Sequence, residues 1–402
     1  MIGDLLIPSD RKIIMLIMDG LGGLRNDAFP QTALEAASTP NLDRLAANGA
    51  CGRSLPIAPG ITPGSGPAHF ALFGYDPLAP ENDAGRGATE VTGVGFELKK
   101  EDVAIRGNFA TINSEGVLTD RRAGRIPHQE GVRICEKLSD NIREIDGIEI
   151  IIMPVREYRF GLVLRGDNLN PAVEETDPQV VDMKPLPPRA MNKDAEFTAG
   201  IISKFIQRCN EVLSDEEKAN TVLMRGISSK PDIQPFKDKF NLDAAAVAFY
   251  PLYRGVAGFC GMKLIDTGGY SPGEAFETVR SGYREGFNFF FIHIKKTDSH
   301  GEDGNLEKKK EVIEDVDSNL PAILDLKPDV IMVTGDHSTP CALKSHSWHP
   351  VPFLIHSDRC GRDRSRAFSE IECDRGSLGV FPAMTIMPRA LANAGMLKKF
   401  GA

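Results

Sequence analysis

The stretch KIIMLIMDG, residues 12–20, is a short and nearly continuous apolar run that ends in Asp19. Two later stretches, FNFFFIHIKKTD at residues 287–298 and VIMVTGD at residues 330–336, repeat this pattern and also end in an aspartate. Short continuous apolar runs are typical of strands that are buried on both faces of a parallel sheet. These three stretches therefore predict central strands of an α/β fold.

Helical patterns separate these runs. One helix is opened by Thr39 at the N-cap and Pro40 at the first position, and another is expected from Leu306 to Leu326. The alternation of strands and helices predicts a doubly wound, mostly parallel α/β sheet. Ligands of such sheets bind beyond the carboxyl ends of the strands. The three aspartates that end the runs are therefore expected to meet at one edge.

The middle of the chain differs from its two ends. Between about residues 98 and 235 the strand-to-aspartate pattern disappears, arginines are frequent, and a proline-rich stretch, MKPLPP, occupies residues 183–188. This change predicts a smaller α+β domain, residues 98–235, inserted into a discontinuous core of residues 1–97 and 236–402.

Composition limits the class of protein. The chain has 402 residues, of which 41% are hydrophobic and 26% charged, and its net charge is −9. These values are ordinary for a globular protein, and the acidic balance argues against nucleic acid or anionic membrane as a partner. No apolar run is long enough to span a membrane, and the first residues do not resemble a signal peptide. Seven scattered cysteines without CxxC pairs indicate reduced thiols and a cytoplasmic location.

Carboxylates and imidazoles cluster near the predicted strand ends. Asp336 and His337 are adjacent, and His346 follows nine residues beyond His337. Carboxylates with neutral imidazoles suit Zn²⁺ or Mn²⁺, and a cluster of this size suits two ions that clamp a transferred phosphoryl group. Each residue alone could belong to a plain turn or a polar loop, so only the joint pattern favours a metal site. Further candidate ligands are Asp19, Asp298, His300 and Glu302.

Ser65 is the candidate nucleophile. It lies between Gly64 and Gly66, just before a helix predicted from Ala68 to Phe73. Glycine lets the backbone approach a ligand closely, and a helix N-terminus offers free N–H groups to an anion. A serine hydroxyl becomes a good nucleophile when a metal or a base lowers its pKa. Alone, this segment would be a glycine- and proline-rich surface loop.

Two arginine groups in the insert, RGNFAT at residues 106–111 and TDRRAGR at residues 119–125, are candidate substrate grips. Guanidinium forks bind phosphate and carboxylate bidentately. Any one of these arginines could equally belong to a solvated basic face.

Taken together, the motifs resemble the archaeal-type 2,3-bisphosphoglycerate-independent phosphoglycerate mutases of the alkaline phosphatase superfamily. The segments that carry the resemblance are MDGLGG, STPNLDRLA, TPGSGPAHFALFGYDP, RGNFAT, TDRRAGR, HIKKTDSHGEDGN, VTGDHSTP, SHSWHPVPF, RGSLGVFPA and LKKFGA. The resemblance implies a phosphatase-like core with two divalent metal ions (Mn, Zn, Mg or Co), an inserted substrate-binding domain, and no requirement for 2,3-bisphosphoglycerate.

The resemblance also implies roles for single residues. Ser65 matches the serine that is transiently phosphorylated. One metal site matches Asp19, Ser65, Asp336 and His337, and the other matches Asp298 and His346. Glu302 occupies the place where the family motif TDxxGHDG usually has a histidine, which leaves open whether Glu302 or His300 is a ligand. The expected substrate contacts are Arg106, Asn108, Asp120, Arg121, Arg122 and Arg125, together with Arg254, where the family would have a lysine.

The implied activity is the interconversion of 3-phosphoglycerate and 2-phosphoglycerate, small phosphorylated substrates of glycolysis and gluconeogenesis. Two alternatives are kept: a metal-dependent phosphomonoesterase or phosphotransferase for another small metabolite such as homoserine, and a non-catalytic protein that binds a phosphorylated metabolite. Homo-oligomerisation is left open.

Overall fold

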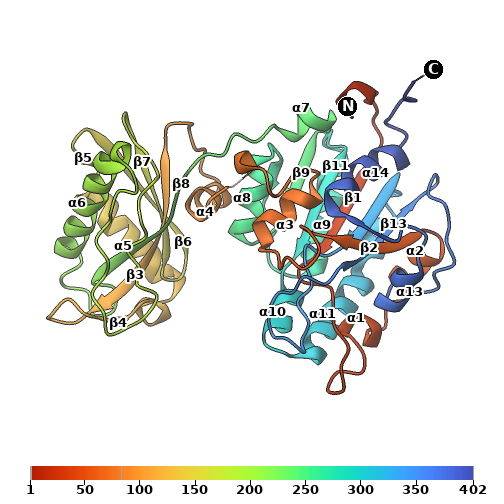
Figure 1. The fold of residues 1–402 in the computed structure, drawn as a ribbon, viewed down its shortest axis with the longest axis horizontal. Helices are drawn as coiled ribbons and strands as arrows, with labels where there is room; N and C mark the ends of the chain where they lie inside the picture. Colours follow the sequence, from red (N-terminus) through yellow and green to blue (C-terminus); the bar gives the residue numbers. More distant parts are fainter. Residues whose placement is uncertain (1, 83, 402) are drawn as a thin grey trace. The chain divides into compact units, whose positions relative to one another are not determined.

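The computed structural model describes residues 2–82 and 84–401. The chain forms two compact units, one made of residues 1–83 and 233–402 and the other of residues 84–232 (Figure 1). The predicted domain limits at residues 97/98 and 235/236 stay a prediction. Among the described residues, no helix is both long enough and apolar enough to cross a membrane.

The first unit is built on an eight-stranded sheet in the order β10-β9-β11-β1-β12-β13-β2-β14. The strands are β1 (Ile13–Met18), β2 (Ala50–Leu55), β9 (Ala244–Val247), β10 (Lys263–Ile265), β11 (Phe289–Ile294), β12 (Val330–Thr334), β13 (Val351–Ser357) and β14 (Val380–Pro382). β1 pairs in parallel with β11 on one side and β12 on the other, and β13 is antiparallel to both of its neighbours. The predicted fold class, a mostly parallel α/β sheet, is confirmed.

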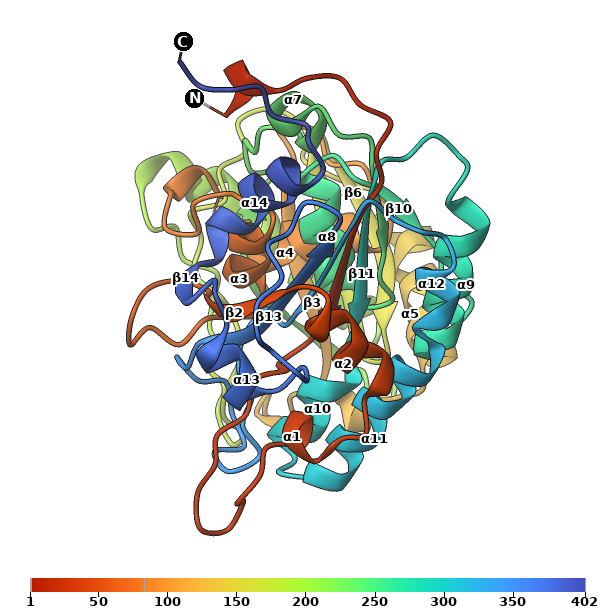
Figure 2. The same cartoon turned by 90° about the vertical axis from the view of Figure 1, so that its right-hand side faces the viewer.

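Helices cover both faces of this sheet (Figures 1 and 2). They are α1 (Ala33–Ala36), α2 (Pro40–Ala47), α3 (Ser65–Leu72), α7 (Phe236–Phe240), α8 (Pro251–Phe259), α9 (Pro272–Gly282), α10 (Lys296–Glu302), α11 (Leu306–Asn319), α12 (Pro321–Leu324), α13 (Glu370–Arg375) and α14 (Ile386–Asn393). The helix expected from Leu306 to Leu326 is interrupted before Pro321, because proline lacks an N–H and its ring crowds the preceding turn.

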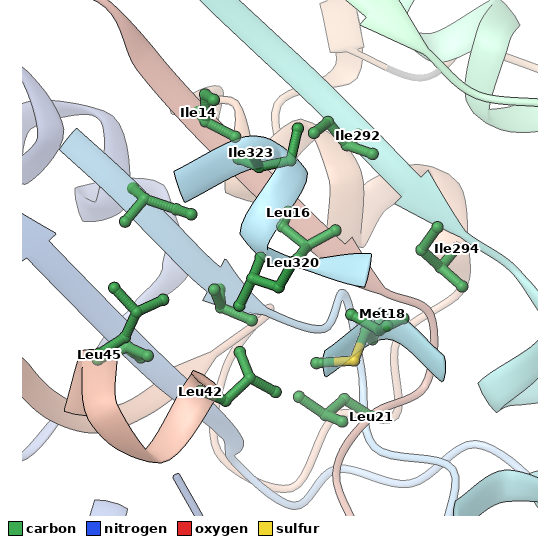
Figure 3. Packing of buried hydrophobic residues seen from close by; sticks show 14 of the residues in the cluster. Ile14, Leu16, Met18, Leu21, Leu42, Leu45, Ile292, Ile294, Leu320 and Ile323 are labelled. Carbon is green, nitrogen blue, oxygen red and sulfur yellow. The ribbon is translucent and has the colours of Figure 1, made fainter. Parts of the chain in front are cut away.

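The alternation of side chains along β1 explains why this strand is apolar throughout. Ile14, Leu16 and Met18 face one core cluster, together with Leu42 and Leu45 of α2 (Figure 3). The other face of the sheet is packed with aromatic rings. Phe291 of β11 lies 4.9 Å from Phe73, and Phe289 of the same strand lies 4.8 Å from Phe236, measured between ring centroids. Both faces of the central strands are therefore covered by apolar side chains.

The second unit is an antiparallel sheet with helices on both faces. Its strands follow the order β4-β3-β7-β6-β5, with β8 paired to β3. The elements are α4 (Arg86–Gly93), β3 (Val103–Ile112), β4 (Leu118–Asp120), α5 (His128–Asn141), β5 (Glu144–Ile145), β6 (Ile148–Arg156), β7 (Arg159–Arg165), α6 (Glu196–Val212) and β8 (Thr221–Ser229). Helices α5 and α6 share a core cluster with one face of the sheet, and Val91 of α4 reaches Gly161 on the other face.

Candidate active site

The polar residues predicted at the strand ends come together at the carboxyl edge of the large sheet. Asp19 directly follows β1, and Asp336 and His337 follow β12. The sequence predicted that Asp298 ends a strand. The structure instead places it in the first turn of α10, four residues after β11. Asp19, Asp298, Asp336 and His337 are all buried.

The turn after β1 is fixed by its neighbours on both sides. Met18 and Leu21 are buried in the core that Figure 3 shows, so the chain must reverse within two residues. Gly20 makes this possible with φ of +62°, a conformation that glycine adopts without strain. A Cβ at Gly20 would also lie 2.4 Å from the Thr339 hydroxyl oxygen, so the position is closed to any larger residue.

Three groups form a first candidate metal site. The ligand atoms of Asp19, Asp336 and His337 all lie within 4.8 Å of one another. His337 Nε2 is 3.5 Å from Asp19 Oδ1 and 3.2 Å from Asp336 Oδ2. These two carboxylate oxygens are buried and have no hydrogen-bond donor among the described residues. Buried acceptors without a donor are costly, so this geometry fits a divalent cation.

A second candidate site adjoins the first. The ligand atoms of Asp298, His337 and His346 also lie within 4.8 Å of one another. His346 Nε2 is 3.4 Å from Asp298 Oδ1, and the His346 ring stacks on His337 at 3.6 Å between centroids. His337 belongs to both groups, so the two candidate sites have one residue in common.

Ser65 lies beside these groups. Helix α3 begins at Ser65, with Gly64 at the N-cap, and not at Ala68 as expected. Pro67 lies within the first turn, where proline is tolerated because the N–H it lacks has no partner there. The Ser65 hydroxyl oxygen is 3.2 Å from His337 Nε2. The predicted nucleophile and the first metal site are therefore within contact of each other.

The choice between Glu302 and His300 has a geometric counterpart. Glu302 Oε1 lies 3.8 Å from His346 Nε2, whereas His300 Nδ1 lies 3.8 Å from Asp303. Burial raises the pKa of Glu302, and the charge of Asp298 adds to this. Neither residue is in the two tight groups, but Glu302 faces them through His346.

The electrostatic field of the site keeps His337 and Asp298 in the forms that bind cations and opposes ionisation of Asp336. Burial lowers the pKa of His337 to about 4, so its imidazole is neutral near pH 7, as a ligand must be. Burial and the charge of Asp19 raise the pKa of Asp298, but His346 and Lys295 outweigh them and bring it to about 2. Burial, with Asp19 beside it, raises the pKa of Asp336 well above its usual range. Carboxylates this close together repel one another when ionised, and a nearby positive charge would stabilise their ionised forms.

The residues expected to bind substrate are spread over two structural units. Arg254 belongs to the first unit, on α8, where it pairs with Asp266 at 2.8 Å. Arg106 and Asn108 lie on β3 of the second unit. Arg106 pairs with Glu90 at 3.1 Å, and the amide oxygen of Asn108 is buried with no donor among the described residues.

The remaining expected substrate residues lie where β4 ends. Asp120 accepts hydrogen bonds from the N–H groups of Arg122 and Gly124 at 2.7 and 3.0 Å. Arg121 makes a bidentate pair with Asp177, both bonds 2.8 Å long. Arg122 and Arg125 are exposed. The structure thus places Asp120, Arg121, Arg122 and Arg125 on one turn.

Several residues around the metal groups had not been expected. Lys295 Nζ lies 3.0 Å from Asp19 and 2.5 Å from Asp298. The Tyr253 hydroxyl donates to Asp19, and the His293 ring stacks on Tyr253 at 3.6 Å. Lys295 could have been found from its place three residues before Asp298 in the same helical turn. Tyr253 and His293 carry no such signal.

Comparison with known proteins identifies relatives of the chain. The family model of 2,3-bisphosphoglycerate-independent phosphoglycerate mutase matches residues 46–219. A probable mutase of this kind from Aquifex aeolicus is 48% identical over 100% of this chain and 99% of its own length. One from Thermus thermophilus is 46% identical over 97% of this chain and 96% of its own.

Two solved structures are similar to this chain over nearly its whole length. A protein from Pyrococcus horikoshii is similar with a TM-score of 0.82 and 30% identity, covering 98% of this chain and 99% of the other. The cofactor-independent phosphoglycerate mutase of Thermoplasma acidophilum is similar with a TM-score of 0.73 and 28% identity, covering 96% and 100%.

Proposed function

The chain belongs to the family of 2,3-bisphosphoglycerate-independent phosphoglycerate mutases, and from this premise we propose that it interconverts 3-phosphoglycerate and 2-phosphoglycerate through a phosphorylated Ser65. The observation that carries the proposal is the 3.2 Å contact between the Ser65 hydroxyl and His337, next to three buried aspartates. A nucleophile inside a cluster of cation ligands is what phosphoryl transfer requires.

Two divalent metal ions fit this site. Asp19, Ser65, Asp336 and His337 would hold one ion, and Asp298, His346 and Glu302 would hold the other. When bound, such ions neutralise the charge of the transferred phosphoryl group and lower the pKa of a serine hydroxyl. Carboxylate, imidazole and hydroxyl donors suit Mn²⁺, Zn²⁺, Mg²⁺ or Co²⁺. Glu302 is the better candidate than His300, because its carboxylate lies on the same side as His346.

The chain's own residues would provide the nucleophile and the contacts that hold the substrate. Ser65 takes the phosphoryl group from the 3-hydroxyl of the substrate and returns it to the 2-hydroxyl. Arg122 and Arg125 are exposed, so their guanidinium groups are accessible to an anionic substrate. Asp120 is held by two backbone N–H groups and is suited to accept a substrate hydroxyl. Arg106, Asn108, Arg121 and Arg254 complete the proposed contacts.

The alternatives differ in where the phosphoryl group goes. A phosphomonoesterase would pass it to water, a phosphotransferase would pass it to another metabolite, and a binding protein would not move it. The relatives that match this chain over nearly their whole length are named as mutases. This does not favour the three alternatives. A cytoplasmic location and the oligomeric state stay predictions.

The decisive experiment compares Ser65→Ala with the wild type and with Thr62→Ala, an exposed neighbour in the same loop. Ser65→Ala leaves Asp19, Asp336 and His337 to hold the first ion, so it should keep its metal content, measured by elemental mass spectrometry, and should lose 2-phosphoglycerate formation. Thr62→Ala should keep both. Chelation should inactivate the wild type, and 2,3-bisphosphoglycerate should not stimulate it. Persistent isomerisation by Ser65→Ala, or faster release of inorganic phosphate than of 2-phosphoglycerate by the wild type, would refute the proposal.

A further inference from the structure

Lys309 is a buried lysine beneath the candidate metal centre. It lies on α11, and only 1% of its surface is exposed. Among the described residues it has no carboxylate within ion-pair distance. Its ammonium donates instead to three backbone carbonyl oxygens, those of Gly20 at 2.7 Å, Thr339 at 2.9 Å and Gly22 at 3.4 Å. Only the charged form has three N–H groups to donate.

Burial of this charge needs an explanation. Moving an ammonium group out of water costs several kcal/mol, and an apolar side chain of similar volume is often at least as stable. The same face of α11 carries Ile313 and Val316, both fully buried, so an apolar residue at position 309 would continue the core. The desolvation cost of the ammonium is explained if the function of Lys309 is to donate hydrogen bonds to the three carbonyl groups.

The carbonyl groups belong to the two turns that carry the metal ligands. Gly20 follows Asp19, and its N–H donates to Asp336 Oδ1 at 3.0 Å. The Thr339 hydroxyl donates to Asp298 Oδ1 at 2.6 Å and lies 3.0 Å from His337 Nδ1. The first turn is therefore one residue or one hydrogen bond away from two ligands of the first candidate site, and the second turn is one hydrogen bond away from ligands of both sites.

We propose that Lys309 is a positioning residue of the metal centre. Its ammonium holds the turns at residues 20–22 and 338–340 at the spacing that lets Asp19, Asp298 and His337 converge. The inference rests on the proposed function only in taking these residues as metal ligands. The N–H of Thr339 also joins the turns, because it donates to the carbonyl groups of Gly20 and Gly22 at 3.2 and 3.1 Å. Without the ammonium, all three buried carbonyl groups lose a donor, this N–H remains as the link, and the ligands of both sites are held less tightly.

The test is Mn²⁺ binding to the full chain with Lys309→Met, followed by calorimetry and by electron paramagnetic resonance of the bound ion. Outer-shell partners of metal ligands typically change metal affinity 10- to 100-fold, and we expect a loss of this size for Lys309→Met. Two variants serve as controls: Lys310→Met removes an adjacent lysine that is paired with Glu307, and Ile313→Ala destabilises the same helix at an apolar side chain that gives no hydrogen bond to either turn. Both should bind Mn²⁺ as the wild type does.

The outcomes separate this inference from the proposed function. A wild type that binds no Mn²⁺ would refute the metal centre itself. A Lys309→Met variant that binds Mn²⁺ within about twofold of the wild type, or an Ile313→Ala variant that loses as much affinity as Lys309→Met, would overturn the role of Lys309.

A labelling experiment on the wild type covers the case in which Lys309→Met does not fold. Coupling between two sites is reciprocal. If the hydrogen bonds of Lys309 strengthen metal binding, metal binding must in turn stabilise these hydrogen bonds. Mn²⁺ should therefore slow acetylation of Lys309 by a larger factor than it slows thiol modification of Cys373, a buried residue of the same unit that reports unfolding. Equal protection of the two residues would overturn the proposal.

Discussion

Lys295 offers a quantitative test of the electrostatics of the site. Its ammonium lies 3.0 Å from Asp19 and 2.5 Å from Asp298, one carboxylate from each candidate metal group, and its side chain is 24% exposed. In the metal-free protein it is the cation closest to both carboxylates among the described residues. Replacing Lys295 by Met removes this charge and keeps most of the aliphatic side chain.

The expected loss follows from these distances. At an effective dielectric constant of about 20, each pair has an attraction of roughly 6 kcal/mol, before the desolvation of the charges is subtracted. Removing one member of a buried pair typically costs about 3–5 kcal/mol, and the remaining exposure of Lys295 places it at the lower end. For a unit of this size, about 3 kcal/mol corresponds to a decrease in Tm of roughly 6–12 °C.

The loss should depend on metal. Divalent ions would supply the charge that Lys295 no longer provides, so with saturating Mn²⁺ we expect about 1 kcal/mol or less, a decrease of roughly 3 °C. The assay is thermal unfolding of wild type and Lys295→Met, each with chelator and with Mn²⁺. Lys296→Met, at an exposed neighbouring lysine, should change neither transition. Equal decreases with and without Mn²⁺ would refute the reasoning.

Three further perturbations test other parts of the site. Gly20→Ala should abolish metal binding, because its Cβ would lie 2.4 Å from the Thr339 hydroxyl and its φ of +62° is strained for alanine; metal retained at wild-type stoichiometry would contradict this. Glu302→His should shift the preference from Mg²⁺ towards Zn²⁺, since imidazole is the softer donor, and competition between the two ions measures the shift. Burial lowers the pKa of His69 to about 3 and of His337 to about 4, from 6.5, so between about pH 4 and 6.5 the unfolded imidazoles bind protons that the folded ones do not. Stability of the chelated protein should therefore rise with pH in this window, by up to about 1.4 kcal/mol per unit for each histidine; denaturant midpoints that do not flatten in His69→Gln would count against the assignment.

The central strands and the aspartates that follow them were predictable because the sequence signals for both are local. The apolar run of β1 can only be buried on both faces, and an aspartate directly after such a strand must lie at the carboxyl edge. Ser65 was a candidate because of its two glycines and the helix after it, but its role as nucleophile was implied by the family resemblance. The antiparallel direction of β13 left no mark in its sequence, because a continuous apolar strand reads the same in both directions.

The partners of the ligands were not predictable, because their roles arise only from tertiary contacts. Tyr253 lies on α8, more than two hundred residues from Asp19, and nothing in its local sequence distinguishes it from a core aromatic residue. Lys309 is one of three consecutive lysines, and only its orientation on α11 separates it from the exposed Lys308 and the half-buried Lys310. Periodicity assigns a face to a residue but does not say which backbone groups lie opposite.

The position of β1 between β11 and β12 has a consequence for biosynthesis. Ile13–Met18 is synthesised long before both of its neighbours in the sheet, Phe289–Ile294 and Val330–Thr334. At typical translation rates of 5–20 residues per second, this apolar strand waits between about 15 and 55 seconds for its partner. Nascent chains of this protein should accordingly engage a chaperone through their first strand, and release should coincide with the appearance of β11.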